Sequence, residues 1–139
     1  MPTFLDTNVL LYGVTNDPKE FKKRSVADSI ISDAACVISF QVLQEFYTQA
    51  TRTSRAYPLS AVQARDVLET YLRFPVIGGT WPLIERALEI EANTKFNYWD
   101  CAIIAAALLG GCNVLYTEDM QHGREIEGVR IVNPFLEAA

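Results

Sequence analysis

Short apolar runs alternate with longer helical patterns along the chain, and this alternation restricts its fold more than any other feature. The apolar runs are expected to be strands, at residues 3–5, 36–38, 75–77, 114–116 and 129–132. Strands that are separated by helices form parallel sheets whose two faces are covered by those helices. The pattern therefore predicts an α/β fold, namely a three-layer α/β/α sandwich with a parallel sheet of about five strands and right-handed crossovers.

Apolar residues at helical spacing mark the segments between these runs. We expect helices at residues 9–14, 19–33, 40–53, 61–74, 81–94 and 98–109. Ser39, Thr80 and Asn97 are the expected N-caps of three of them. The chain has 139 residues and shows no repeat or linker, so we expect one domain spanning residues 1–139.

Three of the expected strands end in polar side chains that can take part in chemistry. Asp6 follows the first strand, Ser39 the second, and Thr117-Glu118-Asp119 the fourth. The carboxyl ends of parallel strands lie at one edge of a sheet, and ligands bind outside that edge in open α/β folds. These residues are therefore expected at one site.

Two further acids are expected at the same edge. Glu45 lies less than two turns beyond Ser39, about 9 Å along the following helix. Asp100 lies in the first turn of the helix that leads into the fourth strand. If that helix runs antiparallel to the strand, its start lies near the edge too. Asp6, Glu45, Asp100 and Asp119 can therefore converge.

Four converging carboxylates point to a metal site. Carboxylates within about 5 Å repel each other by roughly 3 kcal/mol per pair at an effective dielectric constant near 20. The cluster persists only if some acids are protonated or cations bind. Oxygen ligands without His or Cys select Mg²⁺ or Mn²⁺, and Mg²⁺ with open positions for phosphate oxygens suits phosphoryl transfer.

The net charge of −5 argues, taken alone, against a general polyanion binder. Two bound divalent cations would bring the charge of the remaining surface to about −1, so a nucleic-acid substrate is not excluded.

Each acid also has a purely structural interpretation. Asp6 is a possible helix N-cap, Asp100 a possible capping-box acid with Asn97, and Asp119 a possible Asx-turn residue. Glu45 is a possible solvated acid on a helix face. Only the joint placement of the four acids favours the functional interpretation.

The cysteines and the single histidine do not form a recognisable redox, zinc or triad motif. Cys36, Cys101 and Cys112 form no CxxC pair and are expected to be reduced packing residues of a cytoplasmic protein. His122 is the only histidine, so a His-based triad or zinc site lacks partners, and we expect it on the surface or in a turn. The longest apolar run, residues 101–109, is shorter than the roughly 20 residues of a membrane-spanning helix, and no secretory signal is visible.

Four segments match the motifs of a known family in the family's order. They are FLDTN at residues 4–8, QEF at 44–46, YWDCA at 98–102 and LYTEDM at 115–120. In these segments the chain resembles the PIN-domain nucleases, and among them the VapC-type toxins of toxin–antitoxin pairs. The resemblance spans nearly the whole chain and implies a PIN-like fold.

The resemblance implies an endoribonuclease that depends on Mg²⁺, for which Mn²⁺ can substitute. The mechanism that the resemblance implies is in-line attack of a metal-activated water on an RNA phosphodiester, which leaves 5′-phosphate and 3′-hydroxyl ends. Asp6, Glu45, Asp100 and Asp119 match the acids that hold the metal and catalyse the reaction. The residues expected around them are Thr7, Asn8, Ser39, Thr117 and Glu118, with Asn8 and Thr117 supporting the acids by hydrogen bonds and Glu118 either sharing the metal or facing outward.

The resemblance also implies a homodimer and a cognate antitoxin that blocks the acidic pocket, often with a basic side chain. The acids repel RNA phosphates until metal binds, so basic side chains outside the acidic pocket must hold the substrate. The candidates for these cations are Lys22, Lys23, Arg24, Arg52 and Arg55.

The sequence is also compatible with two other functions. One is a non-catalytic PIN-like module that binds RNA or protein. The other is a metal-dependent phosphatase of the haloacid-dehalogenase type, which needs a second aspartate two residues after the first, where this chain has Asn8.

Overall fold

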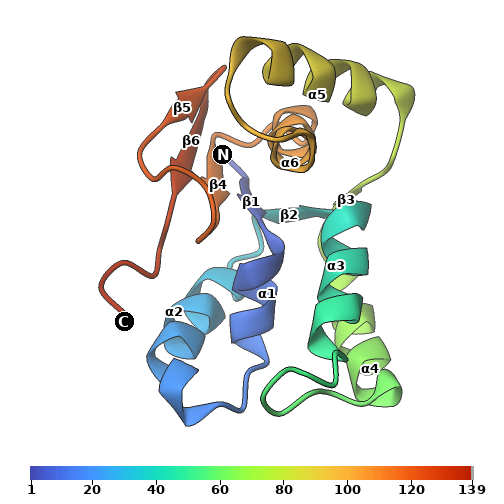
Figure 1. The fold of residues 1–139 in the computed structure, drawn as a ribbon, viewed down its shortest axis with the longest axis vertical. Coiled ribbons are helices and arrows are strands. Elements are labelled where there is room, and N and C mark those ends of the chain that lie inside the picture. Colours follow the sequence, from blue (N-terminus) through green and yellow to red (C-terminus); the bar gives the residue numbers. More distant parts are fainter. Residues whose placement is uncertain (139) are drawn as a thin grey trace.

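The computed structural model describes residues 1–138, which form three layers with a sheet in the middle (Figure 1). The sheet has six strands in the order β3-β2-β1-β4-β6-β5. Their bounds are β1 (Thr3–Leu5), β2 (Cys36–Ser39), β3 (Val76–Ile77), β4 (Val114–Tyr116), β5 (Glu125–Ile126) and β6 (Val129–Val132). The predicted α/β sandwich is therefore confirmed.

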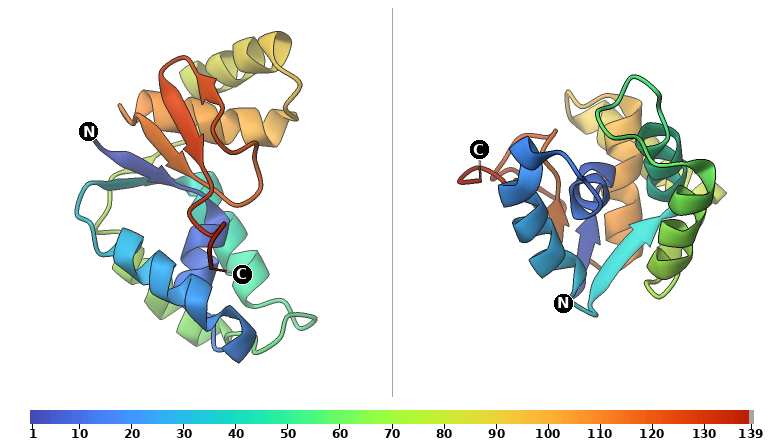
Figure 2. Two further views of the ribbon diagram at one scale, coloured as in Figure 1. Left: turned by 90° about the vertical axis from the view of Figure 1, so that its left-hand side faces the viewer. Right: turned by 90° about the horizontal axis from the view of Figure 1, so that it is seen from below.

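Helices cover both faces of this sheet. They are α1 (Thr7–Gly13), α2 (Phe21–Ile31), α3 (Phe40–Ala50), α4 (Ala61–Tyr71), α5 (Trp81–Asn93) and α6 (Tyr98–Leu109), with a short 3-10 helix, η1 (Pro18–Glu20). In Figure 1, α5 and α6 lie above the sheet, and α1 to α4 lie below it. The view from below in Figure 2 shows α1 between α2 and α3, both of which it contacts.

The predicted N-caps are confirmed, whereas three of the predicted helices end two or three residues earlier than expected. The side chains of Ser39, Thr80 and Asn97 each accept a hydrogen bond from a backbone N–H in the first turn of the following helix. The helix predicted at residues 19–33 is divided into η1, which Asp17 caps by accepting from the Lys19 backbone N–H, and α2, which ends at Ile31. The helices predicted to reach residues 53 and 74 end at Ala50 and Tyr71.

The sheet is parallel except at one edge. Five of its strands pair in parallel, as predicted, whereas β5 pairs antiparallel with β6. Glu127 and Gly128 form the turn between them and have φ angles of 49° and 94°, which are typical of a tight hairpin turn. β5 was not predicted because a strand of two residues carries no periodic signal.

Strand β1 lies at the centre of the sheet, between the strands that the chain adds early and those that it adds late. β1 pairs with β2 on one side and with β4 on the other. The chain first adds β2 and β3 on one side and later adds β4 and β6 on the opposite side. The carboxyl ends of β1 and β4 thus form the topological switch point at which α/β proteins bind ligands.

Helix α6 forms much of the core. The residues from Cys101 to Ala107 are all buried, and α6 lies between the sheet and α5 (Figure 1). Cys36, Cys101 and Cys112 are buried and free, which confirms that they are packing residues. Within residues 1–138, every helix is too short or too polar to cross a membrane.

Candidate active site

Asp6 lies at the switch point and is only 6% exposed. Its Oδ1 accepts a hydrogen bond from the backbone N–H of Thr7 at 2.7 Å, so Asp6 caps α1. Its Oδ2 accepts from the hydroxyl of Thr117, at the end of the neighbouring strand, at 2.8 Å. Asp6 is therefore an N-cap, as one interpretation of the sequence held, but only its Oδ1 has this role. Its Oδ2 faces the end of β4.

A cavity of about 90 Å³ lies beside Asp6 and is lined by all four predicted acids, Asp6, Glu45, Asp100 and Asp119. They come from the end of β1, from α3, from α6 and from the loop after β4. The predicted convergence of the four acids is present in the structure. Three amide side chains line the same cavity, those of Asn8, Gln41 and Gln49.

Glu45 is held between two helices and is not a freely solvated acid. Its Oε2 accepts from the hydroxyl of Thr7 on α1 at 2.8 Å, and its Oε1 accepts from Nε2 of Gln41 at 3.0 Å. Ser39 fixes the start of α3, because its Oγ accepts from the backbone N–H of Val42 at 3.3 Å. Ser39 itself does not line the acidic cavity; it supports Glu45 by capping the helix that carries it.

Asp100 occupies the first turn of α6 and is paired with the cap of that helix. Oδ1 of Asn97 accepts from the backbone N–H of Asp100 at 2.9 Å, and Nδ2 of Asn97 donates to Oδ2 of Asp100 at 3.2 Å. The second bond joins two side chains, so it differs from a capping box, in which the acid accepts from the backbone of the N-cap. Asp100 therefore supports its own helix end while lining the cavity.

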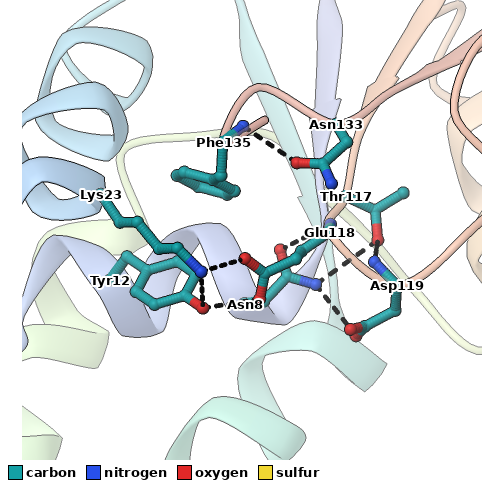
Figure 3. A network of polar contacts seen from close by, with 8 residues as sticks. All are labelled: Asn8, Tyr12, Lys23, Thr117, Glu118, Asp119, Asn133 and Phe135. Atoms are coloured by element: carbon teal, nitrogen blue, oxygen red, sulfur yellow. Dashed lines mark hydrogen bonds and ion pairs between the residues drawn. The ribbon is translucent and has the colours of Figure 1, made fainter. Parts of the chain in front are cut away.

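Asn8 connects α1 to the loop that carries Asp119 (Figure 3). Its Nδ2 donates to Oδ2 of Asp119 at 3.0 Å, and its Oδ1 accepts from the backbone N–H of Glu118 at 3.2 Å. The backbone N–H of Asp119 donates to the hydroxyl of Thr117 at 3.1 Å. Asn8 and Thr117 thus lie where hydrogen bonds to the acids were expected.

Burial and the charges of neighbouring acids raise the pKa values of two of the four acids, Asp6 and Asp100. Burial raises the pKa of Asp6 to about 6, against the lowering effect of the hydrogen bonds from Thr7 and Thr117, and the charges of Glu45 and Asp119 raise it further. Burial also raises the pKa of Asp100, and the charge of Asp119 contributes to that rise. A cation in the cavity would relieve this repulsion and favour the ionised acids.

The chemistry of the cavity fits a hard divalent cation. The acids and amides around it offer oxygen donors, and neither His nor Cys lines it, which is the donor set that Mg²⁺ and Mn²⁺ prefer. Within residues 1–138, no three Asp, Glu, His or Cys side chains are grouped tightly enough to hold a metal as they stand. The carboxylates of Glu45 and Asp119 are instead bonded to protein donors at the cavity wall.

Glu118 points away from the cavity, which decides between the two orientations left open by the sequence. Its Oε1 accepts from the hydroxyl of Tyr12 at 2.6 Å, and its Oε2 forms an ion pair with Nζ of Lys23 at 2.7 Å. Burial raises the pKa of Tyr12 to about 12, and the bond to Glu118 contributes. The hydrogen bond to Glu118 likewise raises the pKa of Lys23.

None of the five basic residues proposed to contact RNA lines the acidic cavity among residues 1–138. Lys23 is engaged with Glu118, and Nη1 of Arg24 donates to the backbone carbonyl of Thr15 at 2.7 Å. Lys22 on α2 is exposed, as is Arg52, while Arg55 is partly exposed; both arginines lie in the turns after α3.

Four residues that line the cavity were missed in the sequence analysis: Gln41, Gln49, Trp99 and the apolar Ile103. The two glutamines lie four residues before and after Glu45 on α3, so helical spacing could have placed them on the same face. Trp99 precedes Asp100 and is 66% exposed; an aromatic residue beside an acid gives no such signal. His122 is exposed, as expected, and its Nδ1 accepts from the backbone N–H of Asn133.

Comparison with known proteins gives consistent matches over most of the chain. The sequence pattern of the PIN domain matches residues 3–124. A toxin–antitoxin complex from Klebsiella pneumoniae contains a chain with a TM-score of 0.69 and 20% identity, covering 95% of this chain and 97% of that chain. No protein with a curated description matches.

Two further solved structures are similar. VapBC2 from Rickettsia felis, bound to a DNA fragment from its promoter, has a TM-score of 0.66 and 18% identity, with 94% of this chain and 97% of that chain covered. VapC20 of Mycobacterium tuberculosis, described as a toxin that cleaves the sarcin–ricin loop, has a TM-score of 0.63 and 19% identity, with 84% and 89% covered.

Proposed function

Because this chain belongs to the PIN-domain family, we propose that it is a metal-dependent endoribonuclease and acts as the toxin of a toxin–antitoxin pair in the cytoplasm. In this proposal residues 1–139 form one nuclease domain. The observation that carries the proposal is the convergence of Asp6, Glu45, Asp100 and Asp119 on one cavity at the switch point of the sheet.

The four acids are the residues that would hold Mg²⁺ or Mn²⁺. The bound ion would supply an activated water and stabilise the charge that develops on the phosphate during phosphodiester hydrolysis. The chain itself orients the ligands: Thr7 and Gln41 hold Glu45, Asn8 holds Asp119, and Thr117 holds Asp6. Burial of Asp6 makes its ionised form costly without a cation, so the site is prepared for positive charge.

RNA is held outside the cavity in this proposal. The cavity is small and lined by acids, so an RNA phosphate can bind there only through a metal ion that the acids hold. We assign contacts with the RNA backbone to the exposed side chains of Lys22 and Arg52 and to the partly exposed Arg55. Lys23 and Arg24 are less suited, because both donate hydrogen bonds to the protein itself.

We also propose the partners that such toxins have. The similar chain from Klebsiella pneumoniae was solved in a toxin–antitoxin complex, and the one from Rickettsia felis was solved as VapBC2 on DNA. A cognate antitoxin would inhibit this chain by inserting a basic side chain among the four acids, where it would replace the cation. The active form would be a homodimer.

The test is cleavage of a labelled RNA by the purified protein in Mg²⁺. We expect cleavage that EDTA abolishes and that Asp6→Asn reduces by on the order of 100-fold or more. Asp66→Asn removes an exposed acid of α4 and should leave the rate unchanged. A protein that binds RNA without cutting it would instead be a non-catalytic module, and release of phosphate from a small monoester would indicate a phosphatase.

A further inference from the structure

Three side chains connect the N-terminal helices to the loop that carries Asp119, and we name them the Glu118 clamp: Tyr12, Lys23 and Glu118 (Figure 3). Lys23 Nζ lies 2.7 Å from Oε2 of Glu118, and the Tyr12 hydroxyl donates to Oε1 at 2.6 Å. Lys23 Nζ also donates to the Tyr12 hydroxyl at 3.2 Å. Both carboxylate oxygens of Glu118 are therefore bound, one by α1 and the other by α2.

The clamp adjoins the bonds that place Asp119. The backbone N–H of Glu118 donates to Oδ1 of Asn8, and Nδ2 of the same amide donates to Oδ2 of Asp119. Asn8 and Tyr12 are four residues apart on α1, so they are neighbours on one helix face. That face holds residue 118 by its backbone and by its side chain, and it also holds the carboxylate of Asp119.

The clamp is partly shielded from water. The side chains of Lys23 and Glu118 are only 25% and 26% exposed, so solvent screens this ion pair less than a fully exposed one. The Tyr12 ring contacts the ring of Phe135 edge-on, with centroids 4.8 Å apart. Oδ1 of Asn133 accepts from the backbone N–H of Phe135, which fixes the turn that presents this ring to the clamp.

We propose that Lys23 and Glu118 are positioning residues of the cation site: together with Asn8, they hold the Asp119 carboxylate at the acidic cavity. This inference rests on the proposed function, in which Asp119 holds a divalent cation. It gives Lys23 a role other than the RNA contact expected from the sequence. For Glu118, which was expected around the acids and either to share the metal or to face outward, it specifies how the residue acts on the site.

The change in cation affinity when the charge of Lys23 is removed distinguishes a positioning role from a purely electrostatic one, because the two roles predict changes of opposite sign. If Lys23 acted only through its charge, its loss would make the surroundings of the acids more negative, and a cation would bind more tightly. If Lys23 holds Glu118 and thereby Asp119, its loss frees the loop, and a cation binds more weakly. Lys22 provides the matched control, because it is an exposed lysine next to Lys23 on α2.

The experiment is isothermal titration of the full-length chain with MnCl₂, with thermal unfolding as a check of the fold. We expect Lys23→Met to weaken Mn²⁺ binding by roughly three- to tenfold, which is less than the loss typical of a residue that bonds the ligand directly. Lys22→Met should bind Mn²⁺ as the parent does or slightly more tightly. Lys23→Arg, which keeps the ion pair, should restore affinity to within about twofold.

Equal or tighter Mn²⁺ binding by Lys23→Met would overturn the proposal. If that variant does not fold, Tyr12→Phe decides: it removes only one hydroxyl and should still weaken Mn²⁺ binding by about two- to threefold, and unchanged binding would overturn the proposal. Slower RNA cleavage by Lys23→Met at unchanged Mn²⁺ affinity would also overturn it and would make Lys23 a substrate contact.

RNA cleavage, assayed separately, distinguishes this inference from the proposed function. If the parent protein binds Mn²⁺ and the clamp variants bind it more weakly, but no RNA is cut, the positioning role stands and the nuclease assignment fails. If RNA is cut in a metal-dependent way and Lys23→Met binds Mn²⁺ normally, only the positioning role fails. A parent protein that binds no Mn²⁺ contradicts both.

Discussion

The hydroxyl of Thr117 donates a hydrogen bond to Oδ2 of Asp6 at 2.8 Å, although the two residues are 111 positions apart in the sequence. β1 and β4 pair in parallel with Leu5 opposite Tyr116, so the next residue of each strand lies at the same edge. Thr117 is fully buried, and its oxygen also accepts from the backbone N–H of Asp119. One hydroxyl therefore connects two of the four acids.

Thr117→Val should remove the hydroxyl that connects these two acids while keeping the shape of the side chain. We expect the free energy of unfolding to fall by about 1–3 kcal/mol, because buried hydrogen-bonding groups lose their partner. Mn²⁺ affinity should fall by roughly 10–100-fold, as for other residues that hold a metal ligand. Denaturant unfolding and calorimetric titration measure the two effects. Thr117→Ser keeps the hydroxyl and should retain most of the affinity; equal losses in both variants would contradict this role.

Asp6→Asn should stabilise the protein when no divalent cation is present. Burial raises the pKa of Asp6 from 3.8 to about 6, so the folded state binds this proton more tightly than the unfolded state does. Stability of the metal-free protein therefore falls as the pH rises from about 4 to about 6, and the full cost, up to about 3 kcal/mol, is present above that range. The variant avoids this cost.

Thermal unfolding in EDTA across pH 4 to 8 measures this effect. The advantage of Asp6→Asn should be near zero at pH 4 and reach about 1–3 kcal/mol at pH 7.5. Saturating Mg²⁺ should raise the melting temperature of the parent protein and have a much smaller effect on the variant. A variant that is less stable than the parent at pH 7.5 in EDTA would contradict the pKa of Asp6 inferred from its burial.

Ser39→Ala should lower the stability of the fold and have little effect on Mn²⁺ affinity. Ser39 caps α3 and lies outside the acidic cavity, so its loss should reduce stability by about 1 kcal/mol and change Mn²⁺ affinity by less than about threefold. Ser60→Ala, which removes the cap of α4, is the matched control for the cap alone. A tenfold loss of Mn²⁺ affinity in Ser39→Ala but not in Ser60→Ala would show that Ser39 belongs to the site.

Arg52→Gln and Arg55→Gln together should weaken RNA binding in a salt-dependent way. In the Asp6→Asn background, which should not cut RNA, the slope of log K against log salt should become shallower by about 0.7 for each phosphate contact removed. Arg65→Gln removes an exposed arginine of α4 that pairs with Glu69 and should leave the slope unchanged. Fluorescence anisotropy at several salt concentrations measures it, and an unchanged slope in the double variant places the RNA elsewhere.

The local patterns of the sequence were sufficient for most of the architecture. Strands at residues 3–5, 114–116 and 129–132 and the helix at residues 98–109 were predicted with the bounds that the structure shows. Each of these segments is mostly apolar and is followed by a turn or capping residue, so local patterns were enough to place its limits. The hairpin of β5 could not be predicted, because it depends on two residues pairing with β6.

The candidate site shows the same division between local and distant causes. The four acids could be placed at one edge because parallel strands align their carboxyl ends there. The orientation of Glu118 could not be predicted, because it depends on Lys23 and Tyr12, which are distant in the sequence. The family motif placed Asp119 at the site, but nothing local to Glu118 indicates which way its side chain points.

The most direct test of the central claim is the anomalous diffraction of a crystal of this protein soaked in MnCl₂. The account predicts Mn²⁺ in the cavity, within about 2.0–2.3 Å of carboxylate oxygens from among Asp6, Glu45, Asp100 and Asp119. It also predicts that the same soak of Asp6→Asn crystals gives a much weaker peak or none. Ordered Mn²⁺ at other surface sites, with the cavity free of it in the parent protein, would contradict the account.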